Sequence, residues 1–125
     1  MHKGSCLCGA VTFEVNLPLP GPDVCHCSQC RKFSGHCFAS CDVDRSAVTI
    51  QGEDNLIWYS GQKARRGFCK TCGSSLFWDP LKHDWIGLAM GAFDTPTETS
   101  VRIHIHVADN GDYYEIKDGL PQNPH

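Results

Sequence analysis

The sequence predicts an all-β fold, built from short strands with little helix. Apolar and polar residues alternate over several short stretches, and turn-forming residues recur at intervals of roughly 8 to 12 residues. The nine cysteines stand mostly in close groups whose spacing suits metal binding. The 125 residues are enough for one apolar core, so we expect a single zinc-binding domain over residues 1–125.

The first expected element is a hairpin or bent strand over residues 4–15. Val11, Phe13 and Val15 alternate with polar residues there, which places them on one buried face. Residues 17–22 contain three prolines and one glycine. That composition excludes regular structure and predicts a stiff surface connection.

A short helical turn is expected over residues 27–33. Ser28 can cap its beginning, and Gly35 can end it in a left-handed conformation. The rest of the chain predicts strands joined by tight turns. These strands fall within residues 36–57, and over 56–59, 64–68, 76–78, 85–89 and 101–107, of which the last shows the most regular alternation.

Three cysteines lie within six residues, at Cys25, Cys27 and Cys30. Sulfurs this close can converge on one soft metal ion and leave a coordination position free, which is the arrangement of a catalytic site. The alternative is a second structural site with a fourth protein ligand. Cys37 or Cys41 could supply that ligand, although such cysteines are more often small buried apolar residues.

Four further cysteines form two distant pairs that predict a closed tetrahedral site of the structural kind. Zinc suits this all-sulfur set, whereas the spacings match no common iron–sulfur ferredoxin pattern. Loss of any one ligand should cost folding. The four cysteines are Cys6, Cys8, Cys69 and Cys72.

Other polar residues are interpreted as solvated rather than functional. His26 is expected to be a solvent-facing spacer inside the three-cysteine run, with a role as a metal ligand or a proton relay as the alternative. His104 and His106 share one face of the predicted strand over 101–107; this spacing can bind a metal, but a solvated face is the simpler interpretation. Similarly, the basic residues of 63–66 are expected at a solvated hairpin tip, with a role in holding a substrate carboxylate as the alternative.

Composition excludes several classes of function. The chain has 11 basic and 14 acidic residues and a net charge of −3, which disfavours a nucleic-acid partner. No segment resembles a signal peptide, and none approaches the roughly 18 apolar residues of a membrane span. We therefore expect a cytoplasmic protein whose odd number of cysteines serves metal or thiol chemistry rather than disulfides.

Four segments, in this order, resemble the glutathione-dependent formaldehyde-activating enzyme family, also described as centromere-protein-V-like. They are Gly4–Val15, Cys25–Gly35, Phe68–Phe77 and Asp118–Pro121. The resemblance implies an Mss4-like (β-tent) fold of small antiparallel sheets. It also implies one structural zinc on Cys6, Cys8, Cys69 and Cys72, and a second, catalytic zinc on Cys25, Cys27 and Cys30.

The same resemblance implies a carbon–sulfur lyase that acts on S-hydroxymethylglutathione, with glutathione and formaldehyde joined in the synthetic direction. The implied partner is a small thiol such as glutathione, and the oligomeric state is left open. The sequence departs from the usual family pattern in two places. Members of the family often have small residues at the positions of Cys37 and Cys41, and a tryptophan near the position of Tyr113. A non-catalytic zinc-stabilised binding module and a thiol redox or metal-buffering protein stay as alternatives.

Overall fold

Ten strands, one α-helix and four 3₁₀ turns make up the chain, and the computed structural model describes all 125 residues. The strands are β1 (His2–Ser5), β2 (Thr12–Val15), β3 (Asp23–Cys25), β4 (Phe38–Asp44), β5 (Val48–Gln51), β6 (Leu56–Ser60), β7 (Arg65–Cys69), β8 (Ser75–Asp79), β9 (Trp85–Ala89) and β10 (Ile103–Ile105). The helix is α1 (Ser28–Ser34), and the 3₁₀ turns are η1 (Arg45–Ala47), η2 (Glu53–Asn55), η3 (Met90–Ala92) and η4 (Val107–Asp109).

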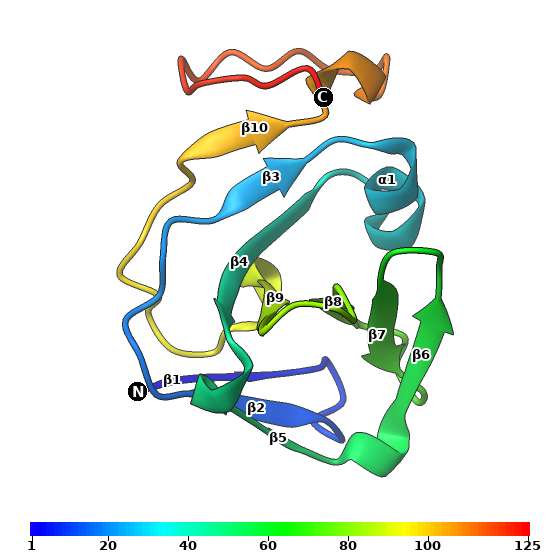
Figure 1. Cartoon of the computed structure of the whole chain (residues 1–125), viewed down its shortest axis with the longest axis vertical. Helices are drawn as coiled ribbons and strands as arrows, with labels where there is room; N and C mark the ends of the chain where they lie inside the picture. The colour runs from blue at the N-terminus through cyan, green and yellow to red at the C-terminus, as the bar shows by residue number, and fades with distance from the viewer.

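The strands form two sheets, and Figure 1 shows the smaller one beyond the end of β4 that is remote from α1. The smaller sheet has the order β1-β2-β5, and the larger has the order β10-β3-β4-β9-β8-β7-β6. The predicted all-β fold with little helix is confirmed. Two details go beyond it: one sheet has seven strands, and the edge pair β10 and β3 is parallel, whereas the other pairs are antiparallel.

Most predicted strands lie where the sequence places them. The expected hairpin over 4–15 is the antiparallel pair β1 and β2, and the expected partners 56–59 and 64–68 are β6 and β7. The strand predicted over 101–107 is wrong in length, because only Ile103–Ile105 pairs with β3. His106 directly after it has a φ of 54°, which turns the backbone out of the strand.

The main apolar core joins the two sheets. Val11, Phe13 and Val15 are at most 1% exposed, as the alternation predicts, and Phe13 packs edge-on against Phe77 of β8 with ring centroids 5.5 Å apart. Complete burial of such a side chain stabilises a fold by about 1.5–3 kcal/mol. The core therefore holds the small sheet against the large one. This packing also places the loop between β1 and β2 next to the loop that follows β7.

No helix of the structure combines the length and the apolar character that a bilayer crossing requires; α1 has seven residues.

A buried carboxylate at the end of β8 connects this strand to β7 and to the turn η1. Asp79 at the end of β8 is 1% exposed and accepts hydrogen bonds from two arginines, Arg45 of η1 and Arg65 of β7, the latter at 2.8 Å. The Arg65 guanidinium also lies over the Trp58 ring at 3.9 Å from its centroid. The expectation that Arg65 belongs to a solvated hairpin tip is thus wrong, because it is ion-paired and packed.

Replacing Asp79 with asparagine is expected to lower the free energy of unfolding by about 2–4 kcal/mol, since it leaves two arginines, each one-third exposed, without their counter-charge. Burial alone would raise the pKa of Asp79, but the hydrogen bonds from Arg45 and Arg65 outweigh it and lower that pKa. A lowered carboxyl pKa stabilises the fold at neutral pH, and this stabilisation disappears as the pH falls below about 4.

Urea unfolding of Asp79→Asn at pH 7 and at pH 3 measures this effect. The difference from the wild type should shrink at the lower pH. Asp54→Asn, which removes an exposed carboxylate from η2, is the matched control and should change the midpoint little. A loss that is equal at both pH values, or equal in the two variants, would contradict the ion-pair explanation.

Candidate metal centres

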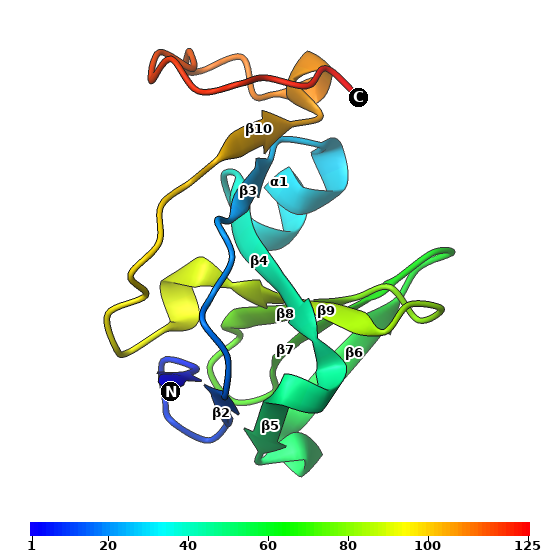
Figure 2. The same ribbon diagram turned by 60° about the vertical axis from the view of Figure 1, so that its left-hand side comes forward.

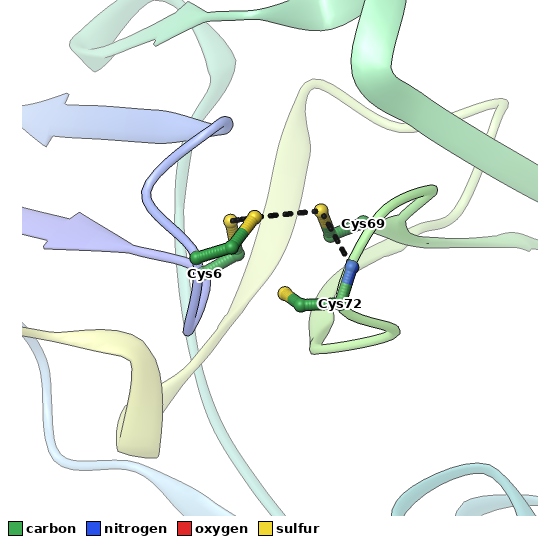
Figure 3. A group of neighbouring side chains, drawn as sticks. Cys6, Cys69 and Cys72 are labelled. Atoms are coloured by element: carbon green, nitrogen blue, oxygen red, sulfur yellow. Dashed lines mark hydrogen bonds between the residues drawn. The ribbon is translucent and has the colours of Figure 1, made fainter.

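The first candidate centre is a cluster of four thiols contributed by two loops. Cys6 and Cys8 come from the loop between β1 and β2, Cys69 ends β7, and Cys72 follows in the turn to β8. Their sulfur atoms all lie within 4.8 Å of one another. Figure 3 shows the side chains of Cys6, Cys69 and Cys72 turned toward a common centre. The Cys8 sulfur lies 3.6 Å from that of Cys6 and 3.7 Å from that of Cys69.

Local backbone geometry explains why these thiols converge. Each loop contains a glycine in the left-handed region, Gly9 with φ 83° and Gly73 with φ 78°, which L side chains rarely adopt. The turns they allow point backbone N–H groups at the sulfurs: Val11 N lies 3.3 Å from the Cys6 sulfur, and Cys72 N lies 3.4 Å from that of Cys69. Such donors stabilise thiolates.

Side chains add to this effect. The Asn55 amide donates to the Cys69 sulfur at 3.2 Å, and the Ser74 hydroxyl lies 3.2 Å from the Cys72 sulfur. The hydrogen bond from Ser74 lowers the pKa of Cys72 to about 5. Four converging sulfurs, of which those of Cys69 and Cys72 have partners that lower the thiol pKa, are the donor set of a structural zinc site, so the residues fit this ion.

The second candidate centre contains three thiols at the junction of β3 and α1. Cys25 ends β3, Cys27 precedes the helix, and Cys30 lies in its first turn; their sulfurs are also within 4.8 Å of one another. The sequence predicts Ser28 as the helix cap. Instead the Cys27 sulfur caps α1 by accepting from the Cys30 N–H at 3.3 Å, and Gly35 ends the helix with φ 90°, as predicted.

Two of these thiols, Cys25 and Cys30, differ in their tendency to ionise. A hydrogen bond from the Cys30 thiol lowers the pKa of Cys25 to about 6, although burial acts in the opposite direction. The same contact, together with burial, raises the pKa of Cys30 far above its ordinary range. Cys25 therefore ionises more readily than Cys30, and the two neighbouring thiols titrate as a pair.

No fourth histidine, cysteine or carboxylate joins this group of three. Cys41 is 1% exposed and packs in the main core, away from the three thiols, which pack with Phe38 and Ala89 in a separate apolar cluster. Burial raises the pKa of Cys41 to about 11, as expected for a thiol that serves as a small apolar residue. Cys37 precedes β4, is partly exposed and also stays outside the group.

Two histidines lie where the sequence does not predict them. His26 is 2% exposed and His104 is 8% exposed, so the expectations of a solvent-facing spacer and of a solvated strand face are wrong for both. The parallel pairing of β10 with β3 places these imidazoles side by side. The C-terminal segment runs next to β10 (Figure 1), and its residues Tyr114 and Asp118 contact the two rings. His106 is exposed, as expected.

One arginine near α1 also departs from the expectation of a solvated hairpin tip. Arg66 of β7 is 8% exposed and donates to the side-chain oxygen of Gln29 in α1 at 3.0 Å. It therefore connects the large sheet to the helix that carries Cys30. Lys63 is exposed, as the interpretation of this segment predicts.

Comparison with known proteins agrees with this geometry. The model of a family described as "Glutathione-dependent formaldehyde-activating enzyme" matches residues 1–109. A protein of Halomonas elongata named "Putative glutathione-dependent formaldehyde-activating enzyme" is 30% identical over 129 residues, covering 92% of this chain and 80% of that protein. A Schizosaccharomyces pombe protein named as an uncharacterized lyase is 29% identical over 76 residues, 61% of this chain and 56% of that protein.

The fold has a solved counterpart in a crystal structure of a Rhodobacter sphaeroides protein, with a TM-score of 0.63 at 24% identity, covering 79% of this chain and 98% of that one. That likeness supports the architecture alone. The family match extends over most of the chain and includes both groups of cysteines. The resemblance seen in the sequence is therefore confirmed, and the chain belongs to the glutathione-dependent formaldehyde-activating enzyme family.

Proposed function

We propose that this protein is a zinc-dependent carbon–sulfur lyase that acts on a small thiol–aldehyde adduct such as S-hydroxymethylglutathione. Cys25, Cys27 and Cys30 hold the catalytic ion, and the four-thiol cluster holds a structural one. The observation that supports this assignment is the difference between the two groups: four converging sulfurs in one, and three without a fourth protein ligand in the other. The family and the lyase-named relative agree with the class of reaction.

When bound at three thiolates, zinc supplies Lewis-acid stabilisation of charge on a sulfur or oxygen atom at the position that the protein leaves open. The chain's own residues prepare the ligands. The Cys30 N–H holds the Cys27 sulfur at the start of α1, and the antiparallel pairing of Cys25 with Phe38 fixes the end of β3. These contacts bring the three sulfurs together.

The proposed reaction is balanced without an oxidant or a reductant. In the breakdown direction, the carbon–sulfur bond of the adduct breaks and its electron pair goes to the thiol sulfur. The hydroxyl O–H bond also breaks, and its electron pair completes the C=O bond of formaldehyde. The released proton goes to the thiolate or to water, and the synthetic direction is the reverse.

The proposal extends to the setting of the reaction. None of the nine cysteines forms a disulfide, and reduced cysteines are typical of a reducing compartment, so we place the reaction in the cytoplasm. We treat residues 1–125 as one catalytic domain, because a single core cluster contains residues of both sheets. A non-catalytic binding module would be favoured by a fourth protein ligand at the second centre, and neither Cys37 nor Cys41 lies in that group.

Zinc-loaded protein is expected to speed the interconversion of glutathione plus formaldehyde and S-hydroxymethylglutathione by about 10³-fold over the uncatalysed rate, since Lewis-acid stabilisation is worth several kcal/mol. Exchange NMR spectroscopy measures this rate at equilibrium. Mild chelation should remove the acceleration and leave the fold intact, and zinc should restore it. An equal concentration of free zinc is the control.

Adducts of formaldehyde with cysteine and with 2-mercaptoethanol, run in parallel, identify the thiol class. If only the glutathione adduct reacts faster, the whole tripeptide is recognised. No acceleration with any of the three adducts would refute the lyase assignment.

A further inference from the structure

A continuous chain of four side chains connects the C-terminal segment to the middle of the three-cysteine run. The Tyr114 hydroxyl contacts His26 Nδ1, and His26 Nε2 lies 2.8 Å from His104 Nδ1. His104 Nε2 in turn lies 2.7 Å from a carboxylate oxygen of Asp118. Of these residues only Asp118 is largely exposed, with a side-chain exposure of 46%.

The chemistry of the ends fixes the direction of these hydrogen bonds. The ionised Asp118 carboxylate can only accept, so His104 donates through its Nε2–H and must accept at Nδ1 if it is neutral. His26 then donates through its own Nε2–H and accepts at Nδ1, where the Tyr114 O–H donates. With both imidazoles neutral, each carries its proton on Nε2, and every donor in this hydrogen-bonded series has an acceptor.

Backbone contacts hold the same residues from the other side. The His26 N–H donates to the Ile105 carbonyl at 3.0 Å. The backbone of His104 forms two hydrogen bonds with the C-terminal segment. Its N–H donates to the Pro121 carbonyl at 3.0 Å, and its carbonyl accepts from the Asn123 N–H at 2.8 Å. Figure 2 shows the tail lying along β10, on the side away from the small sheet.

His26 stands between two thiols of the candidate catalytic centre, Cys25 and Cys27. Its ring is fixed at both nitrogens and its backbone at the N–H, so the peptide units on either side have little freedom. We propose that Tyr114, His104 and Asp118 are positioning residues that hold His26 and thereby set the separation of the Cys25 and Cys27 sulfurs for metal binding. The proposal rests on the three-thiol cluster being a metal site, but not on the reaction catalysed there.

The residues that contact His26 and His104 through their side chains come from a separate part of the chain. Residues matched by the family model end at 109, so Tyr114 and Asp118 lie beyond the matched region while they contact two residues inside it. The C-terminal segment thus supplies part of the support of the site. Outer partners of a metal site typically contribute 10–100-fold to metal affinity.

Cobalt(II) titration of the full chain tests the proposal, because thiolate-bound cobalt has strong absorption and is read without turnover. Mild chelation keeps the tight ion of the four-thiol cluster in place, and the added cobalt then reports the three-thiol cluster. Tyr114→Phe and Asp118→Ala should weaken this binding about tenfold. Asp118→Asn keeps an oxygen that can accept the His104 N–H, and should recover part of the loss.

Tyr113→Phe is the matched control, since it removes the hydroxyl of the adjacent tyrosine, which contacts His36 at 2.7 Å and not His26. Its cobalt affinity should equal that of the wild type. If Asp118→Ala also releases the ion of the four-thiol cluster, that variant has a damaged fold. The cobalt affinity of Tyr114→Phe, which removes only one oxygen atom, then tests the proposal. Nitrogen-15 NMR of the imidazoles gives a second measurement, in which both His26 and His104 should show the Nε2–H tautomer.

The possible failures are distinct. A wild-type chain that binds cobalt at the three thiols, with Tyr114→Phe and Asp118→Ala equally tight, overturns the positioning role alone. An Nδ1–H tautomer at either histidine does the same. A wild-type chain that takes up no cobalt there overturns the proposed function, and the positioning role with it.

Discussion

Cys69→Ala is expected to abolish cooperative folding at 25 °C, while Cys41→Ala leaves a folded protein that has lost about 1 kcal/mol. Both side chains are 1% exposed and both belong to the main core, so the two variants remove the same atoms from equally buried positions. The difference between them is that Cys69 is one of four converging thiols. Structural zinc contributes about 10–16 kcal/mol to folding in small domains, more than most domains can lose.

The effect should be large because of what the cluster joins. Cys6 and Cys8 belong to the loop of the small sheet, and Cys69 and Cys72 to the large sheet. Removing one sulfur should leave the proposed zinc ion short of a ligand and release both loops. Guanidinium unfolding followed by circular dichroism, together with zinc content per chain, measures the result. If the free energy of unfolding of Cys69→Ala is within about 1 kcal/mol of that of Cys41→Ala, the four thiols do not stabilise the fold through a shared ion.

Cys27→Ser is expected to lower turnover of the glutathione adduct by about 10³-fold, the loss of several kcal/mol of Lewis-acid stabilisation. The fold should survive, because serine is itself a preferred helix cap and can accept the Cys30 N–H as the sulfur does. Cys27→Ala removes the cap as well and should cost a further 1 kcal/mol or so of stability. Serine is therefore the better probe of the thiol.

Cys37→Ser provides the control for the second prediction, since Cys37 is a partly exposed thiol outside the group of three. Its turnover and its zinc content should match the wild type, whereas Cys27→Ser should fall from two zinc ions per chain to one. Full activity in Cys27→Ser, or equal loss in the two variants, would contradict a catalytic centre on Cys25, Cys27 and Cys30.

The sequence predicts the cysteine groups well because their spacing is a local property. Pairs separated by one or two residues lie on one tight turn, and the glycines after Cys8 and Cys72 mark those turns. The hairpins follow for the same reason, since alternating apolar residues such as Phe13 and Val15 determine which face is buried. Whether the two cysteine pairs meet depends on packing between sheets, which spacing alone does not establish.

The buried histidine pair could not be found in this way. His26 and His104 are 78 residues apart and meet only because β10 joins β3 in parallel. The alternation over 101–107 predicts the isoleucine side as buried, yet β10 is an edge strand and the C-terminal segment covers its histidine. A pattern within one strand cannot report which face another segment will cover. Asp118 accepts the last hydrogen bond of the series that includes the two histidines. Apart from lying in a segment that resembles the family, it has no sequence pattern that predicts this role.

The separation of the ligands along the chain also sets an order of events during synthesis. The three-thiol run is complete once Cys30 has emerged from the ribosome, whereas Cys8 must wait for a partner 61 residues further on. Closing so long a loop costs more conformational entropy than closing a loop of a few residues. A nascent chain can therefore assemble its three-thiol cluster well before its four-thiol cluster can form.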